Sequence, residues 1–494
     1  MTDQEKRKKK NLWMFPLGTI GRDMLYQLFT NFILVYVLFT RKLTAAQLMA
    51  ITAIMVAARV FDALNDPIMG NIIERTRTKW GKYKPWLAIG ILSTSVVVYL
   101  AFHVQLEGWP FVIFFGFIYF AYSITFTMHD ISYWAMIPSL GSDSSSRDQF
   151  TSRATLFAGL GGTLAGMLVP LLTTGSNTLG GSTQNAYGQV ATLFCILGPA
   201  LLCFTIFGAE EDRSYMTQQA PPVSFRKILS TLTGNDQLLW MALIFLLQQV
   251  GNGIALGGIG STYIYFAFGY EGGLYSLFST IGVAATAVLM VFYPMISRRI
   301  HRKDLMKRMM VLAAVGYAVM LLAGLFLPNN MVKFWIITVF YMLTSLGQYC
   351  FYLIMMISVI NTVEYNEYKT GMRDEAIITS LRPFLTKMAS ALVVLITTVS
   401  YLAFGVTGIT NQISDLEQQA SLGLVAEAEK LSQINGILRG VHSWQTVGLM
   451  VVMSVVPCIL LYASHVLYQK HYILDEQEYA RIVEALEERR NSKT

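Results

Sequence analysis

Charged residues are scarce in this chain, and cysteines are few. Only 14% of its 494 residues are charged and 54% are hydrophobic, whereas an ordinary soluble domain has roughly a quarter charged residues. This composition excludes a soluble enzyme. The net charge of +7 lies in clusters between apolar runs, where it would face lipid headgroups rather than nucleic acid. The cysteines lie in apolar segments without metal-ligand spacing, which argues against a disulfide framework or a metal site: Cys195, Cys203, Cys350 and Cys458.

Long apolar runs recur from end to end, and each is long enough to cross about 30 Å of hydrocarbon. The sequence therefore predicts an all-α polytopic membrane protein with twelve transmembrane helices. The expected spans are 15–40, 44–71, 85–106, 110–138, 149–174, 188–208, 236–268, 273–297, 305–327, 331–362, 376–406 and 440–468. No signal-peptide cleavage site follows the basic tail, so we expect the first helix to direct insertion.

The basic residues predict how the spans are oriented. Lysines and arginines cluster in the N-terminal tail, in the 2/3 loop at 75–84 and in the 8/9 loop at 298–303. Most alternate loops carry neither residue, with Arg41 and Lys42 in the 1/2 loop as an exception. Because basic loops stay on the cytoplasmic side, we expect both termini to lie in the cytoplasm. We expect the membrane to be that of the cell surface.

A polar segment in the middle divides the chain into two sets of six spans. Each half has a basic loop after its second helix, which is typical of parallel transporter repeats. We therefore expect two six-helix bundles that rock about a site at the membrane midplane. The expected parts are a cytoplasmic tail 1–14, a bundle 15–208, a cytoplasmic loop 209–235, a second bundle 236–468 and a cytoplasmic tail 469–494.

Three features outside this plan also carry expectations. In the extracellular 11/12 loop, apolar residues at helical spacing predict one short surface helix over 415–435, either a passive connector or a lid: Ile413, Leu416, Ala420 and Leu424. Alternating charges predict a solvated helix over 475–490. Five glycines between 251 and 260 predict a bend in span seven, or a close helix contact.

Ionisable side chains inside spans are the most informative residues, because each costs roughly 2.5–3.5 kcal/mol to insert at the bilayer centre. Eight lie within or near the start of a span: Arg22, Asp23, Arg59, Asp62, Asp66, Asp130, Arg153 and Lys387. Four are acids and four are bases. This balance predicts a shared, mutually neutralising aqueous cavity.

Asp62 and Asp66 are four residues apart, so their carboxylates share one helix face, with Asn65 beside them. Such oxygens suit a hard cation, and the low ligand charge favours a monovalent ion over calcium. A proton could replace the metal ion, because repulsion between the two acids raises the pKa of one of them. The alternative is that Asp62 pairs with Arg59, three residues earlier.

Asp130 lies four residues before Trp134, which places a carboxylate and an indole on the same helix face. This combination suits a sugar, since the carboxylate accepts hydroxyl hydrogen bonds while the ring covers the apolar face of the pyranose. For Trp134 alone, ordinary packing or anchoring at the membrane interface is the simpler interpretation. His129 points about 100° away from Asp130, so we expect it to pack, although a proton-relay role stays open.

Five motifs stand out along the chain: FDALNDPIMG at 61–70, RTKWGKYKPW at 77–86, GRDMLYQ at 21–27, HDISYWAMIP at 129–138 and EYNEYKTGMRDEA at 364–376. With these motifs the chain resembles the glycoside-pentoside-hexuronide:cation symporter family of the major facilitator superfamily. The resemblance covers essentially all twelve spans. The resemblance implies the major facilitator fold and transport of sugars or glycosides together with sodium, lithium or protons.

The resemblance also implies roles for individual residues. The residues that match the family's cation site are Asp62, Asn65, Asp66 and Thr127. Those that match its sugar site are Asp23 and Asp130 as carboxylates, Trp134 as the stacking indole, Arg153 as a nearby guanidinium and Lys387 as the link between the sites. The chain departs from the family's melibiose carriers at Arg22, Arg382 and Pro383, and in its long 11/12 loop. An additional guanidinium leads to the hypothesis that the substrate is an acidic sugar such as a hexuronide.

Together these observations predict a secondary transporter, not an enzyme, that imports a sugar by symport with Na⁺, Li⁺ or H⁺ and needs neither a cofactor nor an obligate protein partner. Arg22, Asp23, Asp130, Trp134, Arg153 and Lys387 are the expected substrate residues. Two alternatives remain: a sodium-coupled carrier of another substrate such as a lysophospholipid, and a sensor that binds sugar without moving it.

Overall fold

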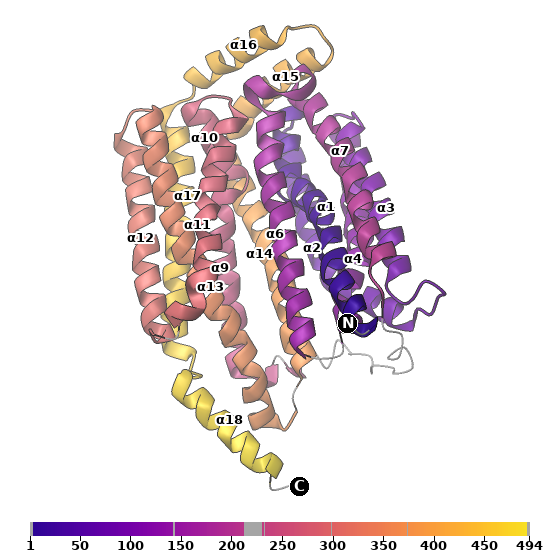
Figure 1. Ribbon diagram of the computed structural model, residues 1–494. Helices are drawn as coiled ribbons and strands as arrows, with labels where there is room; N and C mark the ends of the chain where they lie inside the picture. Colours follow the sequence, from indigo (N-terminus) through magenta and orange to yellow (C-terminus); the bar gives the residue numbers. More distant parts are fainter. Residues whose placement is uncertain are drawn as a thin grey trace. The chain divides into compact units, whose positions relative to one another are not determined.

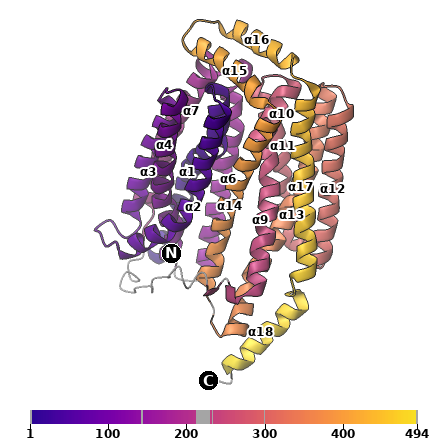
Figure 2. The same ribbon diagram turned by 180° about the vertical axis from the view of Figure 1, so that it is seen from behind.

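The computed structural model describes residues 3–141, 144–211, 230–231, 233–297, 299–372 and 374–491. Over these residues the secondary structure is helical apart from one isolated bridge between Thr78 and Gly81 (Figures 1 and 2). Within the described part, twelve helices are long and apolar enough to cross a membrane. The predicted all-α, twelve-span architecture is confirmed. Part of the predicted central loop, residues 212–229 and 232, lies outside the described residues.

The chain forms two compact units, and the first contains the six N-terminal spans. Its helices are α1 (Asp3–Thr40), α2 (Ala45–Arg75), α3 (Lys84–His103), α4 (Gly108–Ala135), the short α5 (Ile137–Leu140), α6 (Ser144–Thr173) and α7 (Thr183–Cys203). Two short 3₁₀ helices, η1 (Gly175–Asn177) and η2 (Leu179–Gly181), precede α7, and one short π-helix, η3 (Phe204–Gly208), follows it. Helix α1 packs against α6 and α7, and α4 packs against α2 and α3.

Glycines allow α1 to approach its neighbours closely. A Cβ atom added to Gly161 of α6 would lie 2.3 Å from the carbonyl oxygen of Ile20, and one added to Gly21 would lie 2.7 Å from the carbonyl oxygen of Leu197 in α7. Such contacts with backbone atoms leave no room for a side chain. Helix α1 is therefore fixed on two sides, and the polar residues that it carries are held in place.

The second unit contains the remaining spans. Its helices are α9 (Asp236–Leu256), α10 (Gly258–Phe268), α11 (Gly272–Ser297, whose first residues group with the first unit), α12 (Arg302–Phe326), α13 (Met331–Thr370), α14 (Glu375–Ala403), α17 (Ser443–His471) and α18 (Glu476–Asn491). Span seven is broken at Gly257, between α9 and α10, as its glycines predict. Helix α18 confirms the predicted helix in the C-terminal tail.

The 11/12 loop differs from the prediction of one short helix, which is wrong. It forms two helices, α15 (Val406–Ser421) and α16 (Glu427–Arg439), which group with the first unit as part of residues 401–441. Gly423 ends α15 because it adopts a φ of +72°, a conformation that residues with a side chain rarely adopt. Leu424 is consequently 71% exposed instead of continuing the buried face. We call the two helices and the turn between them, residues 406–439, the strap.

Candidate functional site

Arg22 of α1 is the centre of the first polar cluster. Its guanidinium donates hydrogen bonds to Asp130 Oδ1 on α4 at 2.9 Å and to Asp23 Oδ2 at 2.9 and 3.1 Å. The Arg22 side chain is 3% exposed, but those of Asp23 and Asp130 are 18% and 32% exposed. The buried Arg22 guanidinium therefore binds two carboxylates, and each carboxylate remains partly accessible to a ligand.

Aromatic residues of α4 complete this cluster. The Arg22 guanidinium lies 4.6 Å from the ring centroid of Tyr133 and 5.4 Å from that of Trp134. Tyr133 is fully buried, stacks on Phe15 with 4.3 Å between centroids, and donates a hydrogen bond to the Phe15 carbonyl. This contact fixes α4 against α1, so the indole of Trp134 and the carboxylate of Asp130 are held beside Arg22.

The predicted cation residues form a second cluster, between α2 and α4. Thr127 donates a hydrogen bond to Asp66 Oδ1 at 3.1 Å, and Ser123, one turn earlier, donates to Asp62 Oδ1. The carboxylates and the hydroxyls are each four residues apart, so the two helices face each other in register. Asn65 lies beside them, and its Nδ2 atom is buried without a hydrogen-bond partner among the described residues.

Both interpretations of Asp62 are present in the geometry. Arg59 contacts Asp62 Oδ2 at 3.5 Å, a long ion pair in which both side chains are buried. The other carboxylate oxygen of Asp62 faces Ser123, and Asp66 faces Thr127. Carboxylate and hydroxyl oxygens together provide a hard donor set of low charge, which fits a monovalent cation. Among the described residues, no group of three or more His, Cys, Asp or Glu side chains converges on one point.

One predicted substrate residue, Arg153, contacts a part of α1 that lies away from the Arg22 cluster. Arg153 of α6 donates to the carbonyl of Leu12 at 3.2 Å and lies over the ring of Trp13. Leu12 precedes Arg22 by ten residues, or roughly 15 Å along a helix. Lys387 is half-buried on α14, in the second unit, and Arg382 on the same helix is exposed near Tyr352.

Sequence reasoning missed three members of the clusters: Thr19, Ser123 and Tyr133. Thr19 donates to Asp23 Oδ2 at 2.5 Å. Its position four residues before Asp23 is a usable signal, and so is that of Ser123 four residues before Thr127. The buried position of Tyr133 has no comparable signal in the sequence. His129 is fully buried, its ring is edge-on to Phe126, and neither ring nitrogen has a partner in the described part, which supports packing.

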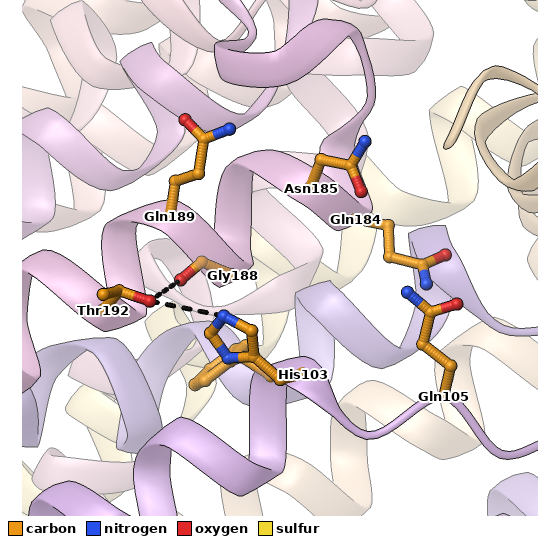
Figure 3. A pocket seen from close by; sticks show the side chains of 8 residues that line it. His103, Gln105, Gln184, Asn185, Gly188, Gln189 and Thr192 are labelled. Atoms are coloured by element: carbon orange, nitrogen blue, oxygen red, sulfur yellow. Dashed lines mark hydrogen bonds between the residues drawn. The ribbon is translucent and has the colours of Figure 1, made fainter. Parts of the chain in front are cut away.

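A separate pocket of about 390 Å³ lies between the end of α3 and the start of α7, and no residue of the two clusters lines it. The lining is polar but uncharged: Phe102, His103, Gln105, Gln184, Asn185, Gly188, Gln189 and Thr192. Figure 3 shows the imidazole of His103 turned toward Thr192, whose hydroxyl lies 3.3 Å from Nε2. The lining of this pocket carries no carboxylate, whereas both charged clusters combine carboxylates with a buried arginine.

Comparisons with known proteins find sugar carriers among the relatives of this chain. Residues 14–428 match the family described as MFS/sugar transport protein. The chain is 26% identical to the lactose permease of Lactobacillus helveticus over 96% of this chain and 71% of the permease. It is 25% identical to the raffinose carrier protein of Pediococcus pentosaceus over 96% of this chain and 71% of the carrier.

Solved structures of transporters have the same fold. A D-xylose-proton symporter superposes with a TM-score of 0.59 at 11% identity, over 86% of this chain and 99% of the symporter. A bacterial homolog of the human lysosomal transporter Spinster superposes with a TM-score of 0.60 at 14% identity, over 94% of this chain and 96% of the homolog. Identities this low carry information about the fold alone.

Proposed function

Because the chain belongs to the MFS/sugar transport protein family, within which it resembles the glycoside-pentoside-hexuronide:cation symporters, we propose that it imports a sugar or glycoside together with a monovalent cation. The protein is a multi-pass membrane transporter and not an enzyme. In the proposed cycle, the two bundles alternately open a midplane site to either side of the membrane. Both termini lie in the cytoplasm, and the membrane is that of the cell surface.

The arrangement of Arg22, Asp23, Asp130 and Trp134 supports the sugar part of this proposal most strongly. Two partly exposed carboxylates can accept hydrogen bonds from sugar hydroxyls, and the neighbouring indole can cover an apolar sugar face. The Arg22 guanidinium is shared by two carboxylates, so the cluster carries net negative charge and disfavours an anionic substrate. This cluster therefore favours a neutral glycoside. A hexuronide would depend on Arg382, and Arg382→Gln should then reduce the preference for uronic acids.

The cation part of the proposal rests on two hydrogen bonds between α2 and α4, from Ser123 to Asp62 and from Thr127 to Asp66. Sodium, lithium or a proton would be held by Asp62 and Asp66 with the oxygens of Asn65 and Thr127. Helix α4 carries Thr127 as well as Asp130, three residues later, so one rigid helix connects the two clusters. A cation that orders Thr127 and Asp66 thereby positions Asp130 for the sugar. The coupling is reciprocal, since each ligand must raise the affinity of the other by the same factor.

The experiment that tests this function is uptake into proteoliposomes of labelled neutral glycosides, pentosides, uronides and one lysophospholipid. Each is measured with an inward sodium gradient at fixed pH, with an inward proton gradient, and without a gradient. We expect a neutral glycoside to accumulate under one of the two gradients. Accumulation of the lysophospholipid instead would favour the lipid carrier, and sugar binding without accumulation would favour the sensor.

A further inference from the structure

The strap contains an ion pair that is completely buried. Lys430 Nζ of α16 lies 3.2 Å from Glu417 Oε2 of α15, and both side chains are 0% exposed. Glu417 also accepts hydrogen bonds from the backbone N–H and the hydroxyl of Thr183, at 2.7 and 3.1 Å, and Lys430 donates to the carbonyl of Gly181 at 2.9 Å. Burial raises the pKa of Glu417, and the Lys430 ammonium opposes that rise. The pair therefore joins both strap helices to the start of α7.

A second set of polar contacts joins the strap to the connection between α1 and α2. The side-chain amide of Asn411 accepts from the backbone N–H of Leu43 and donates to its carbonyl, both at 2.9 Å. Lys42 Nζ lies 2.5 Å from Asp415 Oδ1. A reciprocal amide pair of this kind fixes position and direction together, as a ladder between two strands does. Residues 42–43 and 181–183 are thus two docking points for one short segment.

The face of α15 between these points is buried along its length. Val406, Thr410 and Ile413 are 0–1% exposed, and Leu416 is 9% exposed. Helix α15 packs against α1, α7 and α16, at the end of α1 opposite the N-terminus (Figures 1 and 2). Gln412, on the other side of α15, is exposed. The strap therefore docks on the first unit along the length of α15.

The chain nevertheless tethers the strap to helices of the second unit at both of its ends. Helix α14 ends at Ala403 and α15 begins at Val406, whereas α16 ends at Arg439 and α17 begins at Ser443. Only two residues form the first tether and three form the second. Fully extended, they span about 7 and 10 Å at most. Gly405 in the first tether has a φ of +63°, which allows the sharp turn into α15.

We propose that the strap is a latch, which must leave its docking points at 42–43 and 181–183 when the bundles separate at the outer end and must dock again when they close. This inference rests on the proposed alternating access. Because the tethers are short, any outward movement of α14 or α17 also pulls the strap. The helices on which the strap docks belong to the other bundle, which carries the proposed sugar site. Transport then includes a step in which the buried pair and the Asn411 amide pair are broken and formed again.

A reversible cross-link tests whether the strap has to detach. Lys42→Cys and Asp415→Cys are combined in a chain whose four native cysteines are replaced by serine. We expect disulfide formation between them to lower uptake at least tenfold and a reductant to restore it. The two single-cysteine variants control for oxidation, and a long flexible bis-maleimide on the same pair should preserve part of the uptake. Full uptake with a quantitative disulfide would overturn the latch.

Cysteine labelling follows the docked face directly. Thr410→Cys is compared with Gln412→Cys, its exposed neighbour, in intact cells treated with a membrane-impermeant maleimide. We expect at least tenfold slower labelling at 410 in resting cells, and a several-fold rise at 410 alone when sugar and cation are added. Equal labelling at both positions in resting cells, or protection at 410 that transport does not change, would contradict the proposal.

Variants of the buried pair separate a specific latch from a general loss of structure. Glu417→Gln leaves the Lys430 ammonium buried without its partner, so labelling at position 410 should rise several-fold. Adding Lys430→Met removes that charge and should return labelling toward the parent value. If the parent chain transports no sugar under either gradient, the proposed function fails. The labelling of these variants then still decides whether the pair holds the strap down, because it does not depend on uptake.

Discussion

Replacing Thr127 by valine tests the proposed cation site most directly, because the change removes one hydroxyl and preserves the shape of the side chain. In the structure this hydroxyl donates to Asp66 Oδ1 at 3.1 Å, near the long end of the usual range. With the cation bound, the Thr127 hydroxyl oxygen is a proposed ligand, and a polar contact with a charged group contributes about 1.5–3 kcal/mol, of which we take the lower end. Since 1.4 kcal/mol is a factor of ten, we expect the half-saturating cation concentration to rise about tenfold.

The assay is initial sugar uptake as a function of the coupling cation, at fixed sugar concentration. Thr125→Val is the matched control, because the hydroxyl of Thr125 bonds to the carbonyl of Ala121 on its own helix and does not reach α2. Saturating cation should return the sugar KM of Thr127→Val to within about threefold of the parent value. A half-saturating cation concentration that stays the same in Thr127→Val, or rises equally in Thr125→Val, would refute the ion-site geometry.

Three further predictions concern the proposed sugar site and the packing of α1. Asp130→Asn should raise the sugar KM about tenfold in uptake assays, since a charged hydrogen-bond acceptor worth about 1.5 kcal/mol is lost, and an unchanged KM would remove Asp130 from the sugar site. Gly161→Ala should destabilise the protein by about 1–3 kcal/mol in thermal unfolding, because its Cβ would meet the carbonyl of Ile20, whereas Gly162→Ala should change little. Arg153→Gln should leave the sugar KM within about twofold, and a tenfold increase would instead support its predicted substrate role.

Both clusters contain residues that can be found in the sequence, because the cost of placing charges in a membrane is independent of tertiary structure. This reasoning identifies Asp62 and Asp66 as a pair on one helix face, and Asp130 with Trp134 on another. It cannot find the Arg22–Asp130 ion pair, which joins residues 108 positions apart. It also cannot place Arg153, whose hydrogen bond to the Leu12 carbonyl depends on how α6 packs against α1.

The fold follows a similar division. Hydropathy alone predicts twelve spans, because each must bury about twenty apolar residues in lipid. The two helices of the strap were harder to predict, since the sequence between 401 and 441 is amphipathic and its partner surface lies elsewhere in the chain. The strap's Glu417 and Lys430 look like ordinary surface charges in sequence. Only the docked structure shows that they neutralise each other away from water.

Because of the strap, the boundary between the two six-span halves of the sequence does not coincide with the boundary between the compact units. Residues 401–441, encoded in the second half, complete the packing of the first unit. A chain cut in the central segment 209–235 would therefore yield an N-terminal fragment whose α7 start lacks the carboxylate of Glu417. The C-terminal fragment carries that carboxylate and the Asn411 amide in its strap. When the two fragments are expressed together, the strap of the second fragment can therefore bind to the first and favour their reassembly. A second fragment without the strap would lack this contact.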